Sequence, residues 1–363
     1  MSKIGNSIYS SRVKKLSQFL TKRQAILIST PADIVYLTGF KHLVPEERES
    51  FLLVTSNSNH FLHASFAPFG NQGGINSIKG CSLEQLSQVI QQLIAQKGLE
   101  QLLVDKTSLF VVEYEALSSL PLLEIADFDR DQIWQLRTIK DEMEIKTLKK
   151  AARITSQVMK ETHKSLEVGV TELQLKKNIE KKFKQAGCER SAFPTIVAFG
   201  NHSALPHHQP TSLALKENMP VLIDLGAMVD QYCGDMTRTV WFGDKPDPEF
   251  LLIEKIVKQA YQKTFAQLKT RSPKKMILAK DLDQTARDVI NLAGFGENFI
   301  HTTGHGLGIS LHETLSLNWK NEQPILPGMV ITIEPGIYLE SKFGFRYENT
   351  ILISQNSAQK LTV

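Results

Sequence analysis

Acidic residues interrupt three strand-like apolar segments of this chain, and no other feature restricts its fold as strongly. Asp224 stands in VLIDLGA, Glu334 in MVITIEP and Glu348 in FRYENTILI. A carboxylate inside a buried strand is destabilising unless it is hydrogen bonded, paired with a cation or bound to a metal ion. The fold must therefore bring these segments to shared partners.

A fourth acid, Asp235, begins the strand-like segment DMTRTVWF. If this segment and VLIDL are neighbouring strands of a hairpin, Asp224 and Asp235 can meet across the pair. Single acids also have ordinary explanations, since Asp235 could cap a turn and Glu348 could pair with Arg346. Taken together, the four acids favour a common cation site.

Three histidines, His301, His305 and His312, lie in the glycine-rich stretch HTTGHGLGISLHE, residues 301–313. Each helix-interior glycine costs about 1 kcal/mol relative to alanine, so the alternating glycines favour an extended segment. Glycine also lets a backbone, a metal ion or a ligand approach closely. A lone histidine is usually an ordinary surface or core residue, but three histidines in a chain with four such acids indicate metal chemistry.

Charge balance suggests how many metal ions the acids would hold. Four carboxylates carry a charge of −4, which two divalent cations would neutralise, and one neutral imidazole, His305, completes an oxygen-rich set. Such ligands favour Mn²⁺, Co²⁺, Fe²⁺ or Zn²⁺ over copper. We therefore predict a two-metal hydrolytic site whose ligands are Asp224, Asp235, His305, Glu334 and Glu348.

Composition excludes several other classes of protein. The net charge is only +4 over 363 residues with no basic block, so we expect no nucleic-acid partner. The sequence has no long apolar run and no apolar N-terminal signal, so we expect no membrane span. The three cysteines lie far apart, which favours a reducing compartment and a cytoplasmic location.

The length predicts two domains, which we place at residues 1–130 and 131–363. The first is expected to be α/β, with helices near 11–21 and 82–97 and strands at 25–29, 51–55, 101–105 and 122–126. The second is expected to be α+β, with helices beginning at Asp141 and Thr171 and others at 249–269 and 280–293, and with strands at 195–199, 221–227, 235–242, 329–335 and 345–353.

The sequence resembles the aminopeptidase P and prolidase branch of the pita-bread metallopeptidases. The resemblance rests on NHSALPHHQP, VLIDLGAMVDQYCGDMTRTV, HTTGHGLGISLHE, LPGMVITIEPGIY and FGFRYENTILI, with LRTIKDEMEI and PADIVYLTGF further upstream. It implies a creatinase-like N-terminal α/β domain and a pita-bread catalytic domain. It also implies the same five metal ligands.

The resemblance implies roles for further residues. His207 would reach over the substrate near the metals, His312 would face it from the opposite side, and His301 would lie near the carbonyl. In addition, Glu334 is our own candidate for the residue that shuttles a proton from water to the leaving nitrogen. Arg346 is expected to pair with Glu348 and orient it. His208 has no counterpart, and we expect it to be a solvated loop residue.

The implied activity is hydrolysis of the N-terminal Xaa-Pro bond of peptides, with a hydroxide between two metal ions as nucleophile. Mn²⁺ is the first choice of metal, with Co²⁺ or Zn²⁺ as alternatives, and a homodimer is expected. One motif departs from the family, because Leu315 replaces a usual proline and Ser316 stands where an arginine is frequent. In prolidases that arginine helps hold the carboxylate of a dipeptide, so we expect an aminopeptidase.

Other functions remain open from the sequence. A prolidase is the first alternative. A metal-free creatinase-like hydrolase or a binding module would not need the five ligands, all of which are present. A methionine aminopeptidase would lack the N-terminal α/β domain.

Overall fold

The structure is a computed structural model, which describes residues 3–41, 47–67, 69–70, 74–269 and 276–363. The chain divides into two units, Met1–Arg137 and Thr138–Val363. The boundary expected at residues 130 and 131 lies at the beginning of α5 (Asp131–Thr138), the last helix of the first unit.

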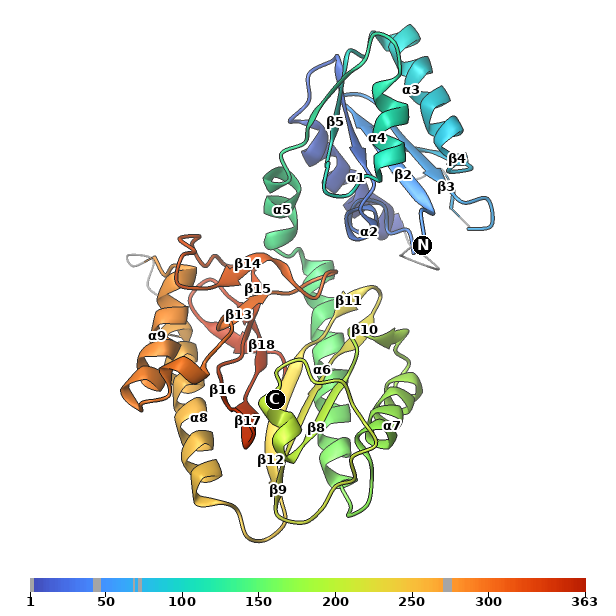
Figure 1. Cartoon of the computed structure of the whole chain (residues 1–363). Coiled ribbons are helices and arrows are strands. Elements are labelled where there is room, and N and C mark those ends of the chain that lie inside the picture. The colour runs from blue at the N-terminus through green and yellow to red at the C-terminus, as the bar shows by residue number, and fades with distance from the viewer. Residues whose placement is uncertain (1–2, 42–46, 68, 71–73, 270–275) are drawn as a thin grey trace. The chain divides into compact units, whose positions relative to one another are not determined.

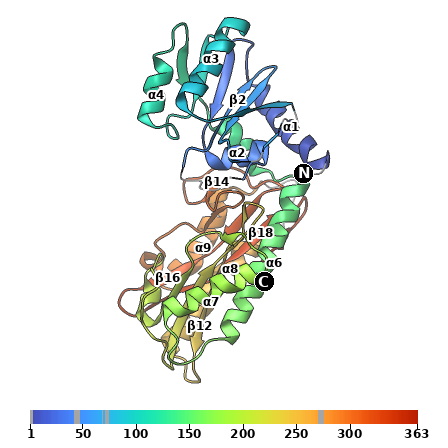
Figure 2. The ribbon, with the colours of Figure 1, turned by 90° about the vertical axis from the view of Figure 1, so that its right-hand side faces the viewer.

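The first unit is built on a six-stranded mixed sheet of order β4-β3-β2-β1-β5-β6. Helices α3 and α4 cover one face of the sheet and α1 and α2 cover the other (Figure 2). The predicted α/β fold is confirmed. The remaining elements are α1 (Lys3–Ser17), β1 (Gln24–Ile28), α2 (Pro31–Thr38), β2 (Ser50–Thr55), β3 (Asn59–His63), β4 (Ile75–Lys79), α3 (Leu83–Lys97), β5 (Gln101–Val104), α4 (Val111–Ser118) and β6 (Glu124–Asp127).

The second unit places helices outside a set of antiparallel strands (Figure 1). The four predicted helices are α6 (Glu142–Lys164), α7 (Glu172–Gln185), α8 (Pro248–Lys269) and α9 (Ala279–Leu292), with 3-10 turns η1 (Gly200–Ala204) and η2 (Gly296–Asn298). Its strands are β7 (Arg190–Ser191), β8 (Ile196–Phe199), β9 (Met219–Leu225), β10 (Ala227–Val229), β11 (Tyr232–Cys233), β12 (Met236–Phe242), β13 (Gly304–Gly306), β14 (Glu313–Leu317), β15 (Val330–Ile333), β16 (Gly336–Leu339), β17 (Phe343–Arg346), β18 (Asn349–Ile353) and β19 (Ala358–Lys360).

Two helix pairs cover two sheets of this unit. Helices α6 and α7 pack on the sheet β12-β9-β8, and α8 and α9 pack on the sheet β14-β13-β15-β18-β19. Side chains alternate between the two faces of a strand, so Ile223 and Leu225 of β9 enter the core beneath the helices while Asp224 faces the opposite way. The same alternation sends Ile331 and Ile333 of β15 toward the helices. The inner faces of both sheets are therefore free to carry polar residues.

One predicted strand is interrupted. Residues 345–353 form two strands, because β17 pairs with β16 whereas β18 pairs with β15. The chain leaves one sheet and joins another at Tyr347 and Glu348, so the carboxylate of Glu348 lies in the gap between two strands. The expected hairpin is confirmed, since β12 pairs antiparallel with β9 and Thr237 stands opposite Asp224.

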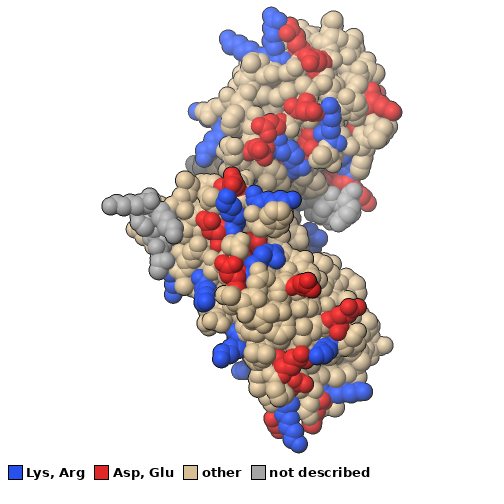
Figure 3. Space-filling view, turned by 60° about the vertical axis from the view of Figure 1, so that its left-hand side comes forward, with Lys and Arg blue, Asp and Glu red and all other residues tan. Residues whose placement is uncertain are grey.

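The sequence has no block of basic residues, and the face of the molecule shown in Figure 3 has no large patch of one charge. On the face shown in Figure 3, acidic and basic side chains are interspersed. None of the helices within the described ranges is both long enough and apolar enough to span a membrane. The homodimer and the cytoplasmic location stay predictions from the sequence.

Gly304 provides a test of how closely β13 and β15 pack. A Cβ at Gly304 would lie 2.2 Å from the backbone oxygen of Thr332, whereas a Cβ at Gly306 would meet its nearest atom at 3.4 Å. Gly304→Ala is therefore expected to lower the free energy of unfolding by about 1–3 kcal/mol, and Gly306→Ala by less than about 1 kcal/mol. Chemical denaturation measures both values, and equal losses would contradict the close approach.

Candidate metal centre

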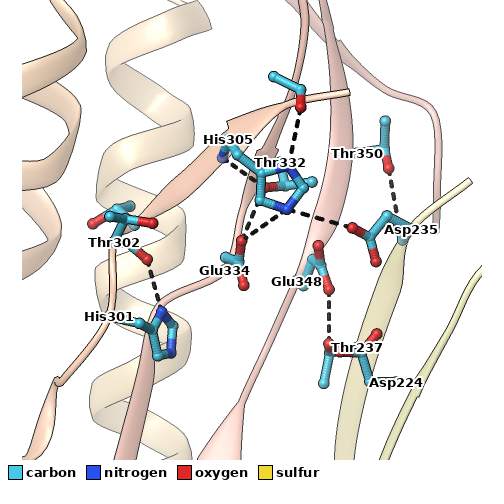
Figure 4. Close-up of polar contacts among 12 residues, drawn as sticks. Asp224, Asp235, Thr237, His301, Thr302, His305, Thr332, Glu334, Glu348 and Thr350 are labelled. Carbon is cyan, nitrogen blue, oxygen red and sulfur yellow. Dashed lines mark hydrogen bonds and ion pairs between the residues drawn. The ribbon is translucent and has the colours of Figure 1, made fainter. Parts of the chain in front are cut away.

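All five predicted ligands line one cavity of about 490 Å³ in the second unit. They come from separate segments but point toward a common space (Figure 4). Asp224 lies on β9, Asp235 directly precedes β12, His305 lies on β13, Glu334 follows β15, and Glu348 lies between β17 and β18.

His305 is oriented by a hydrogen bond from its own ring. Its Nδ1 lies 3.0 Å from the carbonyl oxygen of Gly306. A carbonyl oxygen can only accept, so Nδ1 carries the hydrogen and donates it. The Nε2 lone pair then faces the carboxylates, 3.6 Å from Asp235 Oδ2 and 3.4 Å from Glu334 Oε1. Burial lowers the pKa of His305 and favours the neutral ring. A neutral imidazole with a free Nε2 is the form that binds a metal ion.

Only one arginine or lysine, Arg346, stands among the described cavity-lining residues to balance the four carboxylates. Asp235 and Glu348 are 4% and 1% exposed. Burial, followed by repulsion from neighbouring carboxylates, raises the pKa of both well above the ordinary value. Asp224 Oδ1 and Glu348 Oε1 are buried without a hydrogen-bond partner.

The donor set fits divalent cations. One ligand atom each from Asp235, His305 and Glu348 lies within 4.8 Å of the others. Carboxylate oxygens with one imidazole nitrogen suit Mn²⁺ and its neighbours, and positive charge would offset the repulsion among the acids.

Threonines on the inner strand faces hold several of these groups in place. Thr237 Oγ1 donates to Glu348 Oε2 at 2.7 Å, and Thr332 Oγ1 donates to Glu334 Oε1 at 3.1 Å. Thr332 Oγ1 also accepts the backbone N–H of His305. Our reading of the sequence missed these supporting residues. The signal was present, since Thr332 is the one polar residue of the strand VITI and Thr237 alternates with Thr239 in MTRTVWF.

Arg346 does not have the expected partner. Its Nη2 forms an ion pair with Asp224 Oδ2 at 2.6 Å, so the predicted pairing with Glu348 is wrong. The reason is the change of sheet after Arg346, which removes Glu348 from the strand that carries the guanidinium. Arg346 Nη1 also donates to the hydroxyl of Tyr338 at 2.7 Å. Tyr338 was missed in the sequence, and it links Arg346 to His301.

The three remaining predicted histidines differ in how free their rings are. His301 has both nitrogens engaged, with Nδ1 2.7 Å from the carbonyl oxygen of Thr302 and Nε2 2.9 Å from the Tyr338 hydroxyl. His207 and His312 line the cavity, and neither forms a hydrogen bond within the described ranges. The ring of His312 lies 4.3 Å from that of His305. His207 and His312 are therefore the two available donors.

The structure also places His208 and the two residues that depart from the family motif, Leu315 and Ser316. The expected solvated position of His208 is wrong, because the side chain is 7% exposed and its Nε2 lies 2.9 Å from Glu172 Oε2. Leu315 is buried in the core beneath α8 and α9. Ser316 lines the cavity, and its hydroxyl accepts a hydrogen bond from Asn318.

Similarity to known proteins extends over nearly the whole chain. The model of metallopeptidase family M24 matches residues 146–355, and the model of the creatinase/prolidase N-terminal domain matches residues 12–139. An uncharacterised peptidase of Staphylococcus haemolyticus is 34% identical, over 97% of this chain and 99% of its own length.

Solved structures share the fold. The prolidase from Pyrococcus horikoshii has a TM-score of 0.86 and 31% identity, with 97% of this chain and 98% of that chain covered. The Xaa-Pro dipeptidase from Bacillus anthracis has a TM-score of 0.86 and 26% identity, with 98% and 97% covered. The X-Pro aminopeptidase from Thermotoga maritima has a TM-score of 0.80 and 28% identity, with 96% and 97% covered.

Metal content should separate ligands from substrate-facing residues. The wild-type chain is expected to hold about two divalent ions, the number predicted from the five-ligand set. Asp235→Asn and Glu348→Gln keep the side-chain shape but remove a charged ligand, so both should lose metal. His207→Ala should keep it. Elemental analysis of the purified proteins measures this, and metal loss in His207→Ala as complete as in Glu348→Gln would refute the division.

Removing metal should destabilise the protein most at high pH. The pKa values of Asp235 and Glu348 are raised in the metal-free fold, so protonation there stabilises it at low pH, and that stabilisation is lost as the pH rises through the raised pKa values. The difference in Tm between manganese-loaded and chelated protein should therefore grow as the pH rises above the ordinary carboxylate range. Differential scanning calorimetry measures it. A difference independent of pH would argue against metal at these carboxylates.

Proposed function

Since this chain belongs to metallopeptidase family M24, we propose that it hydrolyses the N-terminal Xaa-Pro bond of peptides as an aminopeptidase. Membership of the family makes it a peptidase. The preference for proline and for longer peptides is our inference from the motifs and the cavity.

Five side chains would hold the metal ions, with Mn²⁺ as the first choice: Asp224, Asp235, His305, Glu334 and Glu348. Two divalent cations bound there would supply the Lewis acidity and the activated water that peptide hydrolysis needs. Thr237, Thr332 and Arg346 hold three of the ligands by direct hydrogen bonds or ion pairs. The arrangement keeps the carboxylates oriented before a substrate enters.

Glu334 would transfer a proton from water to the leaving nitrogen. Its Oε1 accepts the Thr332 hydroxyl, whereas Oε2 forms no hydrogen bond within the described ranges. Burial raises the pKa of Glu334 in the metal-free fold, and Oε2 is the oxygen left free to take a proton from water. It would deliver this proton to the leaving nitrogen of proline, which carries no hydrogen in the peptide.

His207 and His312 serve the carbonyl group of the substrate. Negative charge develops on the carbonyl oxygen during attack, and one donor aimed at it is typically worth about 3 kcal/mol. Both rings line the cavity, and neither has a hydrogen-bond partner in the described ranges. His301 has both nitrogens engaged, so it holds Tyr338 and through it Arg346.

The observation that carries the aminopeptidase assignment is the lack of a free cation on the described cavity wall. Arg346 is the one arginine or lysine among the described lining residues, and it is already paired with Asp224. Ser316 lines the cavity where prolidases often have an arginine. A dipeptide would bring its proline carboxylate there without a partner, whereas a longer peptide brings a neutral amide.

A dipeptidase is the second candidate. It is favoured by the similarity over nearly whole chains to the prolidase from Pyrococcus horikoshii and to the Xaa-Pro dipeptidase from Bacillus anthracis.

Substrate length distinguishes the two candidates. The kcat/KM for Xaa-Pro-Yaa peptides is expected to exceed that for the matching Xaa-Pro dipeptides by about ten- to a hundredfold, the value of one charge-assisted contact. Ser316→Arg should narrow the gap by supplying the missing cation, and Ser316→Ala should leave it unchanged. Steady-state kinetics measure all three proteins. Equal or faster turnover of dipeptides by the wild-type chain would move the assignment to a dipeptidase.

A further inference from the structure

A buried carboxylate outside the cavity organises the loop that carries His207. Glu172 is the first residue of α7, directly after the N-cap Thr171, and it is 0% exposed. Its sequence position indicated only the beginning of a helix. The side chain instead turns toward residues 199–211, the loop that includes η1.

Five donors from this loop converge on the carboxylate. Oε1 accepts the backbone N–H of Phe199 at 2.8 Å and the Nδ1–H of His202 at 2.9 Å. Oε2 accepts the Nε2–H of His208 at 2.9 Å, and both the backbone N–H and the hydroxyl of Thr211 at 2.8 Å. The backbone at both ends of the loop and three of its side chains are therefore bonded to one carboxylate.

The carboxylate is ionised and saturated. Burial by itself raises the pKa of Glu172, but the hydrogen bonds from His208, Phe199, Thr211 and His202 outweigh it and lower the pKa. The N-terminus of α7 also favours negative charge.

A metal ion is the obvious alternative occupant. Ligand atoms of Glu172, His202 and His208 lie within 4.8 Å of one another. An ionised carboxylate offers about four lone-pair sites, however, and five donors already surround this one. An ionised carboxylate can only accept, so in this arrangement the two imidazole nitrogens that face it carry hydrogens and present no lone pair to a cation.

The orientation of the His207 side chain is a consequence of this arrangement. His208 is buried against Glu172, and its neighbour His207 is exposed on the cavity wall. The loop is held from the cavity side as well, since Ser203 Oγ accepts the N–H of Gly344 at 3.0 Å and the carbonyl of Pro206 accepts from Arg346 at 3.4 Å. Fixing His208 on one side of the backbone thus fixes the direction of His207 on the other.

We propose that Glu172, with His202 and His208, is a positioning cluster that holds the 199–211 loop so that His207 points into the catalytic cavity. Its effect on turnover rests on the proposed function. Its effect on the loop does not.

Hydrogen exchange tests the loop independently of activity. Glu172→Gln replaces one acceptor oxygen by a donor that faces existing donors. In the metal-loaded full-length protein, the Phe199 and Thr211 amides should exchange at least about tenfold faster than in the wild type. Glu180→Gln, on an exposed part of the same helix, is the matched control and should change nothing there. Unchanged exchange in Glu172→Gln overturns the proposal, even if the wild-type chain cleaves no Xaa-Pro peptide.

A double-mutant cycle tests whether the cluster acts through His207. Glu172→Gln should lower kcat/KM for an Xaa-Pro-Yaa peptide by about a hundredfold, as expected when a catalytic group is misplaced by about 1 Å. In the His207→Ala background the same change should have less than about a twofold effect. Equal losses in both backgrounds would mean a general structural role and overturn the proposal.

Metal analysis tests whether the cluster binds a metal ion, and a second variant serves if Glu172→Gln does not fold. Metal content should be the same in Glu172→Gln and in the wild type. Loss of one ion per chain on this substitution would make the cluster a metal site and overturn the proposal. If Glu172→Gln does not fold, His208→Phe removes one donor and keeps a buried ring, and the same exchange and kinetic outcomes then decide.

Discussion

Repulsion among buried carboxylates is the interaction on which the second unit depends. Asp224, Asp235, Glu334 and Glu348 line one cavity, and Arg346 is the single arginine or lysine among its described lining residues. One guanidinium cannot balance four acids, and the raised pKa values of Asp235 and Glu348 express the imbalance. The rest of the unit can be understood as the scaffold that keeps these groups together in spite of it.

The scaffold works through the alternation of side chains on strands. Apolar residues such as Ile223 and Ile331 are buried under the two helix pairs, and this burial stabilises both sheets. The same strands carry Asp224 and Thr332 on their inner faces. The hydrophobic core and the candidate metal centre therefore lie on opposite faces of the same sheets, and a change of register by one residue would exchange the two faces.

The candidate metal centre was easier to predict from the sequence than the residues around it. Asp224 and Glu334 were recognisable because a charge in an apolar strand is costly in any fold, and the glycines around His305 indicated close packing. The partner of Arg346 was not predictable, because it depends on the change of sheet between β17 and β18. Within the first unit, β3 and β4 were missed because NHFLH and INSIK contain few apolar residues.

The Glu172 cluster was hidden for a similar reason. Glu172 has the sequence context of an ordinary first-turn helix residue, and His208 looks like one more polar residue in a loop. Only the folded chain brings residues 27 to 39 positions away onto one carboxylate. Contacts of this kind depend on tertiary structure, so local sequence patterns do not predict them.

The most direct test of the central claim is to titrate chelated protein with Mn²⁺ while measuring hydrolysis of an Xaa-Pro-Yaa peptide. The account predicts no turnover without metal, and turnover that rises and saturates at about two ions per chain. Full activity in the metal-free protein, or no activity at saturating Mn²⁺, Co²⁺ and Zn²⁺, would contradict it.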